Sequence, residues 1–351
     1  MADIFENPMG TDGFEFVEYC HTDPAELEKL FTLLGFKKTA RHKSKNVTLF
    51  QQGDISFILN AEPEAMEFAK QHNGGGALAM AFRVKDAAAA MEAAVEKGAT
   101  EVKGRVGPGE LNIPAIEGIG GSVLYLVDCY GDNGSIYDVD FEWIDNAPHT
   151  GAGLTYLDHL THNVHRGHMA EWADFYTNLF NFREIRYFDI EGKLTGLKSK
   201  AMTSPCGKIR IPINESSDDK SQIEEFLKRY NGEGIQHIAL GTDDIYASVE
   251  ALKKLGIAFQ ATPATYYEKI DARVPEHDED LQRMQDLNVL VDGAPTKGQG
   301  ILLQIFTKDA LGPIFFEIIQ RKGNEGFGEG NFQALFESLE EDQVRRGVLQ
   351  A

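Results

Sequence analysis

The sequence predicts an α+β fold built from repeated strand-and-helix units whose sheets curve around a central space. Its 351 residues are enough for two domains with cores of their own. Apolar residues make up 42% of the chain and charged residues 25%, which is typical of a globular protein. The third observation is a repeat, because the order of elements in the first half recurs in the second.

The first element of each half is a strand followed by a helix. Residues 14–19 (FEFVEY) alternate as a strand, and Asp23 is expected to cap a helix that ends at Gly35. In the second half, residues 156–164 predict a strand. The helix after it should have an apolar face made of Met169, Trp172, Phe175, Tyr176, Leu179 and Phe180.

A second unit repeats more closely. Residues 77–99 align without a gap on residues 235–257, and each segment predicts a strand, an amphipathic helix and a terminating glycine. Asp86 and Asp244 stand where each helix needs its cap. Each half then ends in a short apolar strand, so the chain contains four copies of a strand-helix-strand unit.

The link between the halves is expected at residues 145–153 (DNAPHTGAG), where Pro, Gly and Asn separate two apolar runs. We therefore predict an N-terminal domain over residues 1–150 and a C-terminal domain over residues 151–351.

The charge of the chain argues against two classes of partner. Asp and Glu number 55 against 34 Lys and Arg, and the resulting net charge of -21 repels both nucleic acid and an anionic membrane surface. The sequence shows no apolar run long enough to span a membrane and no signal-peptide pattern, so we expect a cytoplasmic protein. The three cysteines are far apart and are expected to be reduced structural thiols.

The two halves differ in residues that could bind a metal. The core strands of the second half carry two histidines and one carboxylate, namely His159, His237 and Glu317. The corresponding positions of the first half are roughly Tyr19, Ala79 and Leu126. Two imidazoles and one carboxylate can hold Fe(II) on one face and leave three positions open. We therefore predict a metal site in the second half and none in the first.

One of the candidate ligands lies in a run of histidines, DHLTHNVHRGH, which contains His159, His162, His165 and His168. Alternate residues of a strand share a face, which places His159 with Leu157 and Thr161 and turns His162 to the other side. His165 and His168 fall at the start of the next helix. Only His159 is therefore expected to be a ligand.

The other two candidates lie in apolar strands. His237 is predicted to share a face with Ile235 and Ala239, although a lone histidine in a strand is often a hydrogen-bonded core residue. Glu317 lies within IFFEII, where an ionised carboxylate needs a cation or a hydrogen-bond partner. Glu317 therefore carries the stronger signal for a metal.

Aromatic and amide side chains are predicted around the metal. Gln304 and Phe306 share one face of their strand, and Phe315 shares the face of Glu317. Phe332 and Phe336 are one helical turn apart in a terminal helix that follows a glycine-rich segment. This helix could be ordinary core packing or a lid over an aromatic substrate.

Five motifs in this order resemble the 4-hydroxyphenylpyruvate dioxygenases, which are vicinal-oxygen-chelate enzymes. The motifs are DHLTHNV, GEGIQHIAL, LLQIF, FFEIIQR and GFGEGNFQALF, and the likeness covers essentially the whole chain. It implies two vicinal-oxygen-chelate domains with a C-terminal helix over the active site. It also implies one Fe(II) per chain, bound by His159, His237 and Glu317.

The resemblance further implies a substrate shell. Its members would be Ser199, Asn214, Gln222, Gln236, Gln304, Phe306, Phe315, Phe327, Phe332 and Phe336. Of these, Gln304, Asn214 and Ser199 are the candidates to hydrogen-bond the substrate. Gln236 directly precedes His237, so strand parity puts it on the other face unless the backbone bulges.

The implied activity is conversion of 4-hydroxyphenylpyruvate, an aromatic α-keto acid, and O2 to homogentisate and CO2 in tyrosine and phenylalanine breakdown. A homo-oligomer is also expected. Two alternatives stay open: a 4-hydroxymandelate synthase of the same fold, and a non-catalytic protein that binds a small molecule. Loss of a ligand would favour the binding protein, and the intact ligand set of the second half speaks against it.

Overall fold

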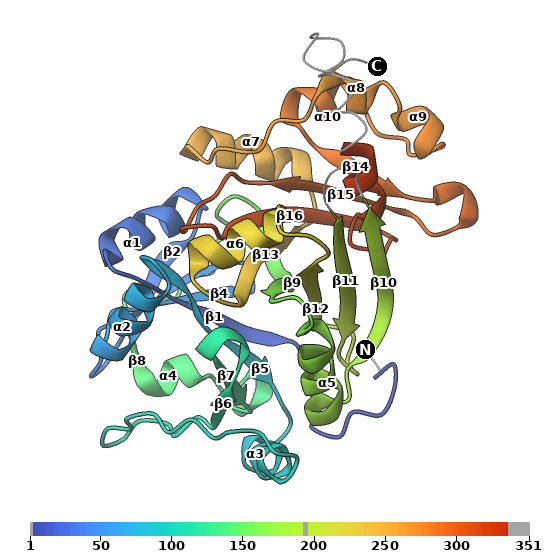
Figure 1. Ribbon diagram of the computed structural model, residues 1–351. Coiled ribbons are helices and arrows are strands. Elements are labelled where there is room, and N and C mark those ends of the chain that lie inside the picture. The colour runs from blue at the N-terminus through green and yellow to red at the C-terminus, as the bar shows by residue number, and fades with distance from the viewer. Residues whose placement is uncertain (1–2, 192–195, 336–351) are drawn as a thin grey trace.

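The structure is a computed structural model that describes residues 3–191 and 196–335. It contains two curved sheets of eight strands each, one from each half of the chain (Figure 1). The described residues between Trp143 and Leu154 form neither helix nor strand. The expected α+β fold is confirmed.

The first sheet has the strand order β6-β7-β5-β1-β4-β3-β2-β8. Its strands are β1 (Phe14–His21), β2 (Lys37–His42), β3 (Val47–Gln52), β4 (Ile55–Asn60), β5 (Gly75–Arg83), β6 (Ala115–Glu117), β7 (Val123–Val127) and β8 (Phe141–Trp143). The helices of this half are α1 (Pro24–Leu33), α2 (Pro63–Gln71), α3 (Ala87–Glu96) and α4 (Ile136–Asp140), with 3-10 turns at Ile119–Gly121 and Gly131–Asn133.

The second sheet has the order β10-β11-β12-β9-β13-β16-β15-β14. Its strands are β9 (Leu154–Val164), β10 (Arg183–Glu191), β11 (Gly196–Thr203), β12 (Arg210–Ser216), β13 (Gly234–Thr242), β14 (Leu290–Gly293), β15 (Ile301–Phe306) and β16 (Phe315–Lys322). The helices are α5 (Met169–Phe180), α6 (Gln222–Tyr230), α7 (Ile245–Leu255), α8 (Ala264–Tyr267), α9 (Ile270–Arg273) and α10 (Leu281–Leu287), with a 3-10 turn at Pro295–Lys297. Residues 329–335 are also helical.

Strand pairing confirms the duplication. In the first sheet β1 pairs parallel to β4 and antiparallel to β5, and in the second β9 pairs in the same way with β12 and β13. The three predicted caps are also present. The carboxylates of Asp23, Asp86 and Asp244 accept hydrogen bonds of 3.1, 2.9 and 3.0 Å from backbone amides in the first turns of α1, α3 and α7.

Two β-bulges change the predicted faces of the central strands. Beside β13, the register of β9 shifts between Leu157 and His159, and the register of β13 shifts between Ile235 and His237. Each bulge inserts one extra residue, which reverses the side-chain parity beyond it. The expectations that Leu157 lies with His159 and that Ile235 lies with His237 are therefore wrong, and both residues lie in the main hydrophobic core.

The register also corrects the positions matched in the first half. Ala239 pairs with His159 and with Glu317, and its counterpart Ala81 pairs with Phe16 and Tyr125. The ligand positions therefore correspond to Phe16, Ala79 and Tyr125. Tyr19 and Leu126, which the comparison of the two half-sequences suggested, lie on the opposite face, in the main core.

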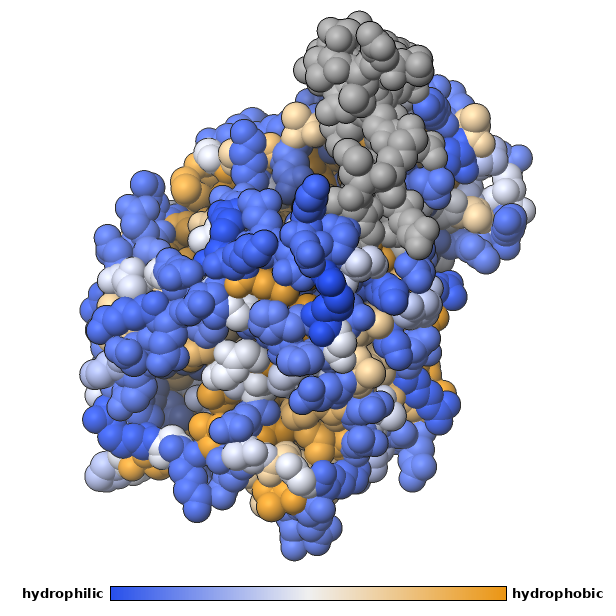
Figure 2. Space-filling model, in the orientation of Figure 1, coloured by the Kyte–Doolittle hydropathy of each residue, from blue (hydrophilic) through white to orange (hydrophobic). Residues whose placement is uncertain are grey.

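The main core joins the two halves. It includes side chains of both sheets, and Phe57 of β4 lies 6.0 Å from Phe316 of β16 between ring centroids. The molecular face in Figure 2 is mostly hydrophilic. Among the described residues, no helix is both long and apolar enough to cross a membrane. The cysteines are free thiols.

Candidate metal centre

Three adjacent strands of the second sheet bring together His159, His237 and Glu317. Their candidate ligand atoms all lie within 4.8 Å of one another. The Oε2 atom of Glu317 lies 3.2 Å from His159 Nε2 and 3.4 Å from His237 Nε2. The three side chains are between 2% and 8% exposed. Among the described residues, this is the only such group of histidine, cysteine and carboxylate side chains.

The pKa values follow from this proximity. Burial by itself would raise the pKa of Glu317, but the two histidines hold it at about 2. Burial would lower the pKa of His159, but the carboxylates of Glu317 and Asp158 raise it. Burial does lower the pKa of His237, which Glu317 only partly offsets. Glu317 is thus an anion at neutral pH, ready to bind a cation.

Each histidine is oriented by the bulged residue that precedes it. His159 Nδ1 lies 2.7 Å from the Oδ1 atom of Asp158, and His237 Nδ1 lies 3.0 Å from the Oε1 atom of Gln236. Because both partners accept the Nδ1 proton, both Nε2 atoms are directed to Glu317 as donors for a metal. The register shift at Gln236 thus brings its side chain to His237.

Amide and aromatic groups lie beside the triad. Gln304 Nε2 donates a 3.1 Å hydrogen bond to Glu317 Oε1. Phe315 stacks on His237 with centroids 4.9 Å apart, and Phe306 lies 6.0 Å from Phe315. The Phe327 ring meets His159 edge to face at 5.3 Å. These rings form an apolar wall beside the triad.

Two more predicted residues lie in a polar row across the sheet. Ser199 of β11 pairs with Asn214 of β12, and Asn214 pairs with Asn163 of β9. Asn163 is on the same face of β9 as His159, and Asn214 Nδ2 donates a 3.4 Å hydrogen bond to its side chain. Ser199 and Asn163 are buried. The row therefore leads toward the triad.

Sequence reasoning missed several residues that support the site. Asp158 and Asn163 both lie in the histidine motif and are buried. A polar residue within an apolar strand needs a hydrogen-bond partner, and this could have indicated both residues from the sequence. Thr161 was noted only for parity, yet its Oγ1 lies 2.9 Å from His237 Nε2. Asn331, in the terminal helix, donates a 2.8 Å hydrogen bond to Gln304 Oε1.

Three members of the implied substrate shell are not placed at the triad by the described contacts. Gln222 is exposed at the first position of α6. The side chain of Phe332 is 38% exposed. Phe336 lies outside the described residues. Their substrate contacts stay predictions.

The other histidines of the run lie outside the triad. His162 is buried on the opposite face of β9, where its Nε2 lies 2.7 Å from the hydroxyl of Tyr176 on α5. His165 and His168 are exposed, and His168 Nδ1 lies 2.6 Å from Glu233. The predicted parity of His159 and His162 is thus confirmed.

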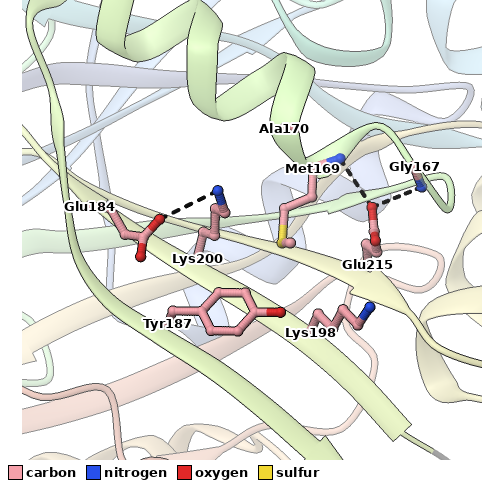
Figure 3. A pocket seen from close by; sticks show the side chains of 8 residues that line it. All are labelled: Gly167, Met169, Ala170, Glu184, Tyr187, Lys198, Lys200 and Glu215. Atoms are coloured by element: carbon pink, nitrogen blue, oxygen red, sulfur yellow. Dashed lines mark hydrogen bonds and ion pairs between the residues drawn. The ribbon is translucent and has the colours of Figure 1, made fainter.

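A separate cleft of about 390 Å³ opens beside α5 and does not include the triad (Figure 3). Three of its polar side chains already have partners, since Glu184 pairs with Lys200 and Glu215 accepts hydrogen bonds from the amides of Gly167 and Met169. The buried convergence of donor atoms at His159, His237 and Glu317 makes the triad the better candidate for chemistry.

The fold places the chain in the vicinal-oxygen-chelate superfamily, and the triad is its candidate metal site. Residues 5–142 match the family described as "Hydroxyphenylpyruvate dioxygenase, HPPD, N-terminal". Residues 156–272 match "Glyoxalase/Bleomycin resistance protein/Dioxygenase superfamily".

Relatives extend this likeness to the whole chain. The 4-hydroxyphenylpyruvate dioxygenase of Pseudomonas aeruginosa is 63% identical over 98% of this chain and 97% of its own. A protein named Hemolysin VllY from Vibrio vulnificus is 63% identical over 98% of both chains. This chain belongs to the 4-hydroxyphenylpyruvate dioxygenase family.

A solved structure supports the fold. It is a mutant of 4-hydroxymandelate synthase from Streptomyces coelicolor, which matches with a TM-score of 0.81 over 95% of this chain and 100% of its own, at 24% identity.

Proposed function

We propose that this chain is an Fe(II)-dependent dioxygenase that converts 4-hydroxyphenylpyruvate and O2 to homogentisate and CO2, with one iron per chain. The observation that carries the proposal is the buried triad of His159, His237 and Glu317 in a chain 63% identical to a 4-hydroxyphenylpyruvate dioxygenase. Two histidines and one carboxylate are the ligand set of non-haem Fe(II) oxygenases.

The donor set fits a divalent iron. It supplies two neutral nitrogen donors and one anionic oxygen donor, already within reach of a single ion. One negative charge leaves a bound Fe(II) with net positive charge, which favours an anionic keto acid over a neutral ligand. When bound, the iron supplies the electron transfer to O2 that none of these side chains can perform.

The residues of the chain would hold the substrate. The amides of Gln304 and Asn214 and the hydroxyl of Ser199 are neutral hydrogen-bonding groups, suited to a phenol and a keto acid without adding negative charge. Gln304 Nε2 donates one of its two hydrogens to Glu317, and Gln304 Oε1 accepts one hydrogen bond from Asn331. One Nε2 hydrogen and one Oε1 lone pair are therefore left for the substrate. The rings of Phe306, Phe315 and Phe327 would pack against the substrate ring and exclude water.

The overall change balances as one keto acid and one O2 giving one homogentisate and one CO2. The original carboxylate leaves as CO2. One atom of O2 completes the new side-chain carboxylate and the other becomes the new ring hydroxyl. The substrate itself provides the electrons, so no second keto acid is needed.

Product identification tests this proposal. The purified chain is incubated with Fe(II), ascorbate, O2 and 4-hydroxyphenylpyruvate, and the products are separated by chromatography. Homogentisate in amounts equal to the CO2 released is the expected result. A yield of 4-hydroxymandelate would assign the chain to the synthase activity instead, and substrate that binds without turnover would support a binding protein.

A further inference from the structure

We propose that Asp158 is a positioning residue that holds the ligand His159 and, through Arg321, ties this ligand to the turn that precedes the C-terminal helix. The inference rests on the proposed function only in taking His159 as a metal ligand. It concerns two residues that lie in the sequence motifs DHLTHNV and FFEIIQR but were given no role by the sequence analysis.

The backbone of β9 places two consecutive side chains in contact at this point. The register shift between Leu157 and His159 makes Asp158 the bulged residue, so its carboxylate can reach the imidazole of the next residue. The side chain of Asp158 is fully buried. Its Oδ1 lies 2.7 Å from His159 Nδ1.

The carboxylate is also paired with a buried arginine. Arg321 donates from Nε to Asp158 Oδ2 at 2.7 Å and from Nη2 to Asp158 Oδ1 at 2.8 Å. The side chain of Arg321 is 8% exposed, so this two-point contact is largely shielded from water. Arg210 adds a more distant positive charge, with Nη1 3.7 Å from Asp158 Oδ2. The orientation of Asp158 is therefore fixed from the side away from His159.

Arg321 uses its remaining nitrogen to hold the following turn. Its Nη1 donates to the carbonyl oxygens of Asn324 and Gly326 at 3.0 and 2.7 Å. Its guanidinium lies 5.7 Å from the centroid of the Phe327 ring, which also contacts His159. A displacement of His159 or of this turn must therefore disturb the same ion pair.

Gln236 provides an internal comparison. It gives His237 the same kind of Nδ1 partner from the same kind of bulge, but it is a neutral amide. The carboxylate of Asp158 polarises His159 more strongly than an amide can. His159 thus has a charged Nδ1 partner and His237 a neutral one. The charged partner, Asp158, is the one that is linked through Arg321 to the turn.

The test is a neutral pair, Asp158→Asn with Arg321→Gln, which removes both charges and leaves no unpaired charge buried. An exposed pair serves as the control, Arg166→Gln with Asp219→Asn, which is joined by a 2.7 Å contact. Co2+ replaces iron as the probe. Its absorption spectrum reports affinity and ligand geometry, and hydrogen exchange of residues 324–335 reports on the turn and helix.

For the wild type and the exposed-pair control, we expect Co2+ to slow exchange in residues 324–335. For the buried-pair variant, we expect Co2+ affinity to fall about 10- to 100-fold, a changed absorption band at saturation, and no slowing of exchange. Unchanged affinity, band and exchange in this variant would overturn the inference.

Two further measurements test the inference if the double variant does not fold. Asp158→Asn alone should show the loss of affinity, and unaltered exchange in Co2+-loaded wild type would itself contradict the link. These outcomes are separate from the proposed function, because wild-type production of homogentisate is measured independently. A chain that makes homogentisate but is insensitive to Asp158→Asn would retain the function and lose this inference.

Discussion

Asn331 donates a hydrogen bond of 2.8 Å to the side-chain oxygen of Gln304, and Gln304 in turn donates to the carboxylate of Glu317. The first described turn of the C-terminal helix is thereby connected to a candidate metal ligand through one amide. The hydroxyl of Tyr266 donates a 2.6 Å hydrogen bond to Asn331 Oδ1. The position of the helix and the orientation of Gln304 therefore depend on each other.

Gly328 is required for this contact. Its φ is +74°, and a Cβ at this position would lie 1.5 Å from Gln304 Oε1. Gly328→Ala should displace Gln304 and lower kcat/KM for 4-hydroxyphenylpyruvate by about 10-fold or more, since even small displacements misplace a reacting group. Steady-state kinetics measure this effect. Gly298→Ala, also at positive φ but with open space at its Cβ, is the control. Equal kinetics for both variants would contradict the prediction.

Glu317→Gln tests the anionic ligand. The change keeps the shape of the side chain but removes the charge that holds a cation, so metal affinity should fall by more than about 100-fold and turnover should be lost. Calorimetric titration with Fe(II) under anaerobic conditions measures the affinity. A fully active variant would show that Glu317 is not a ligand.

The histidine run gives a second test of the ligands. His159→Ala should abolish turnover, because it removes a donor atom 3.2 Å from Glu317. His165→Ala and His168→Ala should leave iron content nearly unchanged, since both side chains are exposed. If replacing His162 removed the iron and the His159→Ala variant still bound iron, the assignment of His159 as the ligand would be contradicted.

His162 should make the protein sensitive to acid. Burial lowers the pKa of its imidazole to about 3 in the folded chain, against an ordinary value of 6.5. As pH falls below that ordinary value the unfolded chain takes up a proton that the folded chain does not, so stability falls with falling pH. The expected loss between about pH 7 and pH 5 is about 2 kcal/mol.

Urea unfolding of the metal-free protein at the two pH values measures this loss. His162→Gln should show a smaller decrease than the wild type, because it removes the titrating group from both states. The same decrease in both proteins would mean that His162 does not cause the sensitivity.

The aromatic residues of the C-terminal segment are predicted to control how the oxidation is coupled. Phe327→Ala removes the ring beside His159 and should give less homogentisate per O2, with 4-hydroxyphenylacetate or 4-hydroxymandelate appearing instead. Phe332→Ala and Phe336→Ala test whether the helix closes as a lid. Simultaneous O2 uptake and product yield are the measurements. Unchanged yields in all three variants would favour ordinary packing of a terminal helix.

The sequence predicted most of the fold and the three residues of the triad because their signals are local. Helix caps such as Asp244 and the buried carboxylate of Glu317 can be identified from neighbouring residues. β-Bulges cannot be identified from neighbouring residues, because they arise from the pairing of two strands. Parity therefore misplaced Leu157 and Ile235.

Contacts between distant segments were equally hidden. The ion pair of Asp158 with Arg321 joins residues 163 positions apart, and no pattern in either segment indicates it. The same holds for Asn331 and Gln304. These contacts between distant segments thus required the structure, whereas the triad itself did not.

The central claim is that one iron, held by His159, His237 and Glu317, produces homogentisate. Its most direct test is a titration of Fe(II) into the metal-free chain with 4-hydroxyphenylpyruvate and O2, following the rate of homogentisate formation. The rate should rise in proportion to added iron and level off at one equivalent per chain. A plateau at two equivalents, full activity without iron, or a product other than homogentisate would contradict the account.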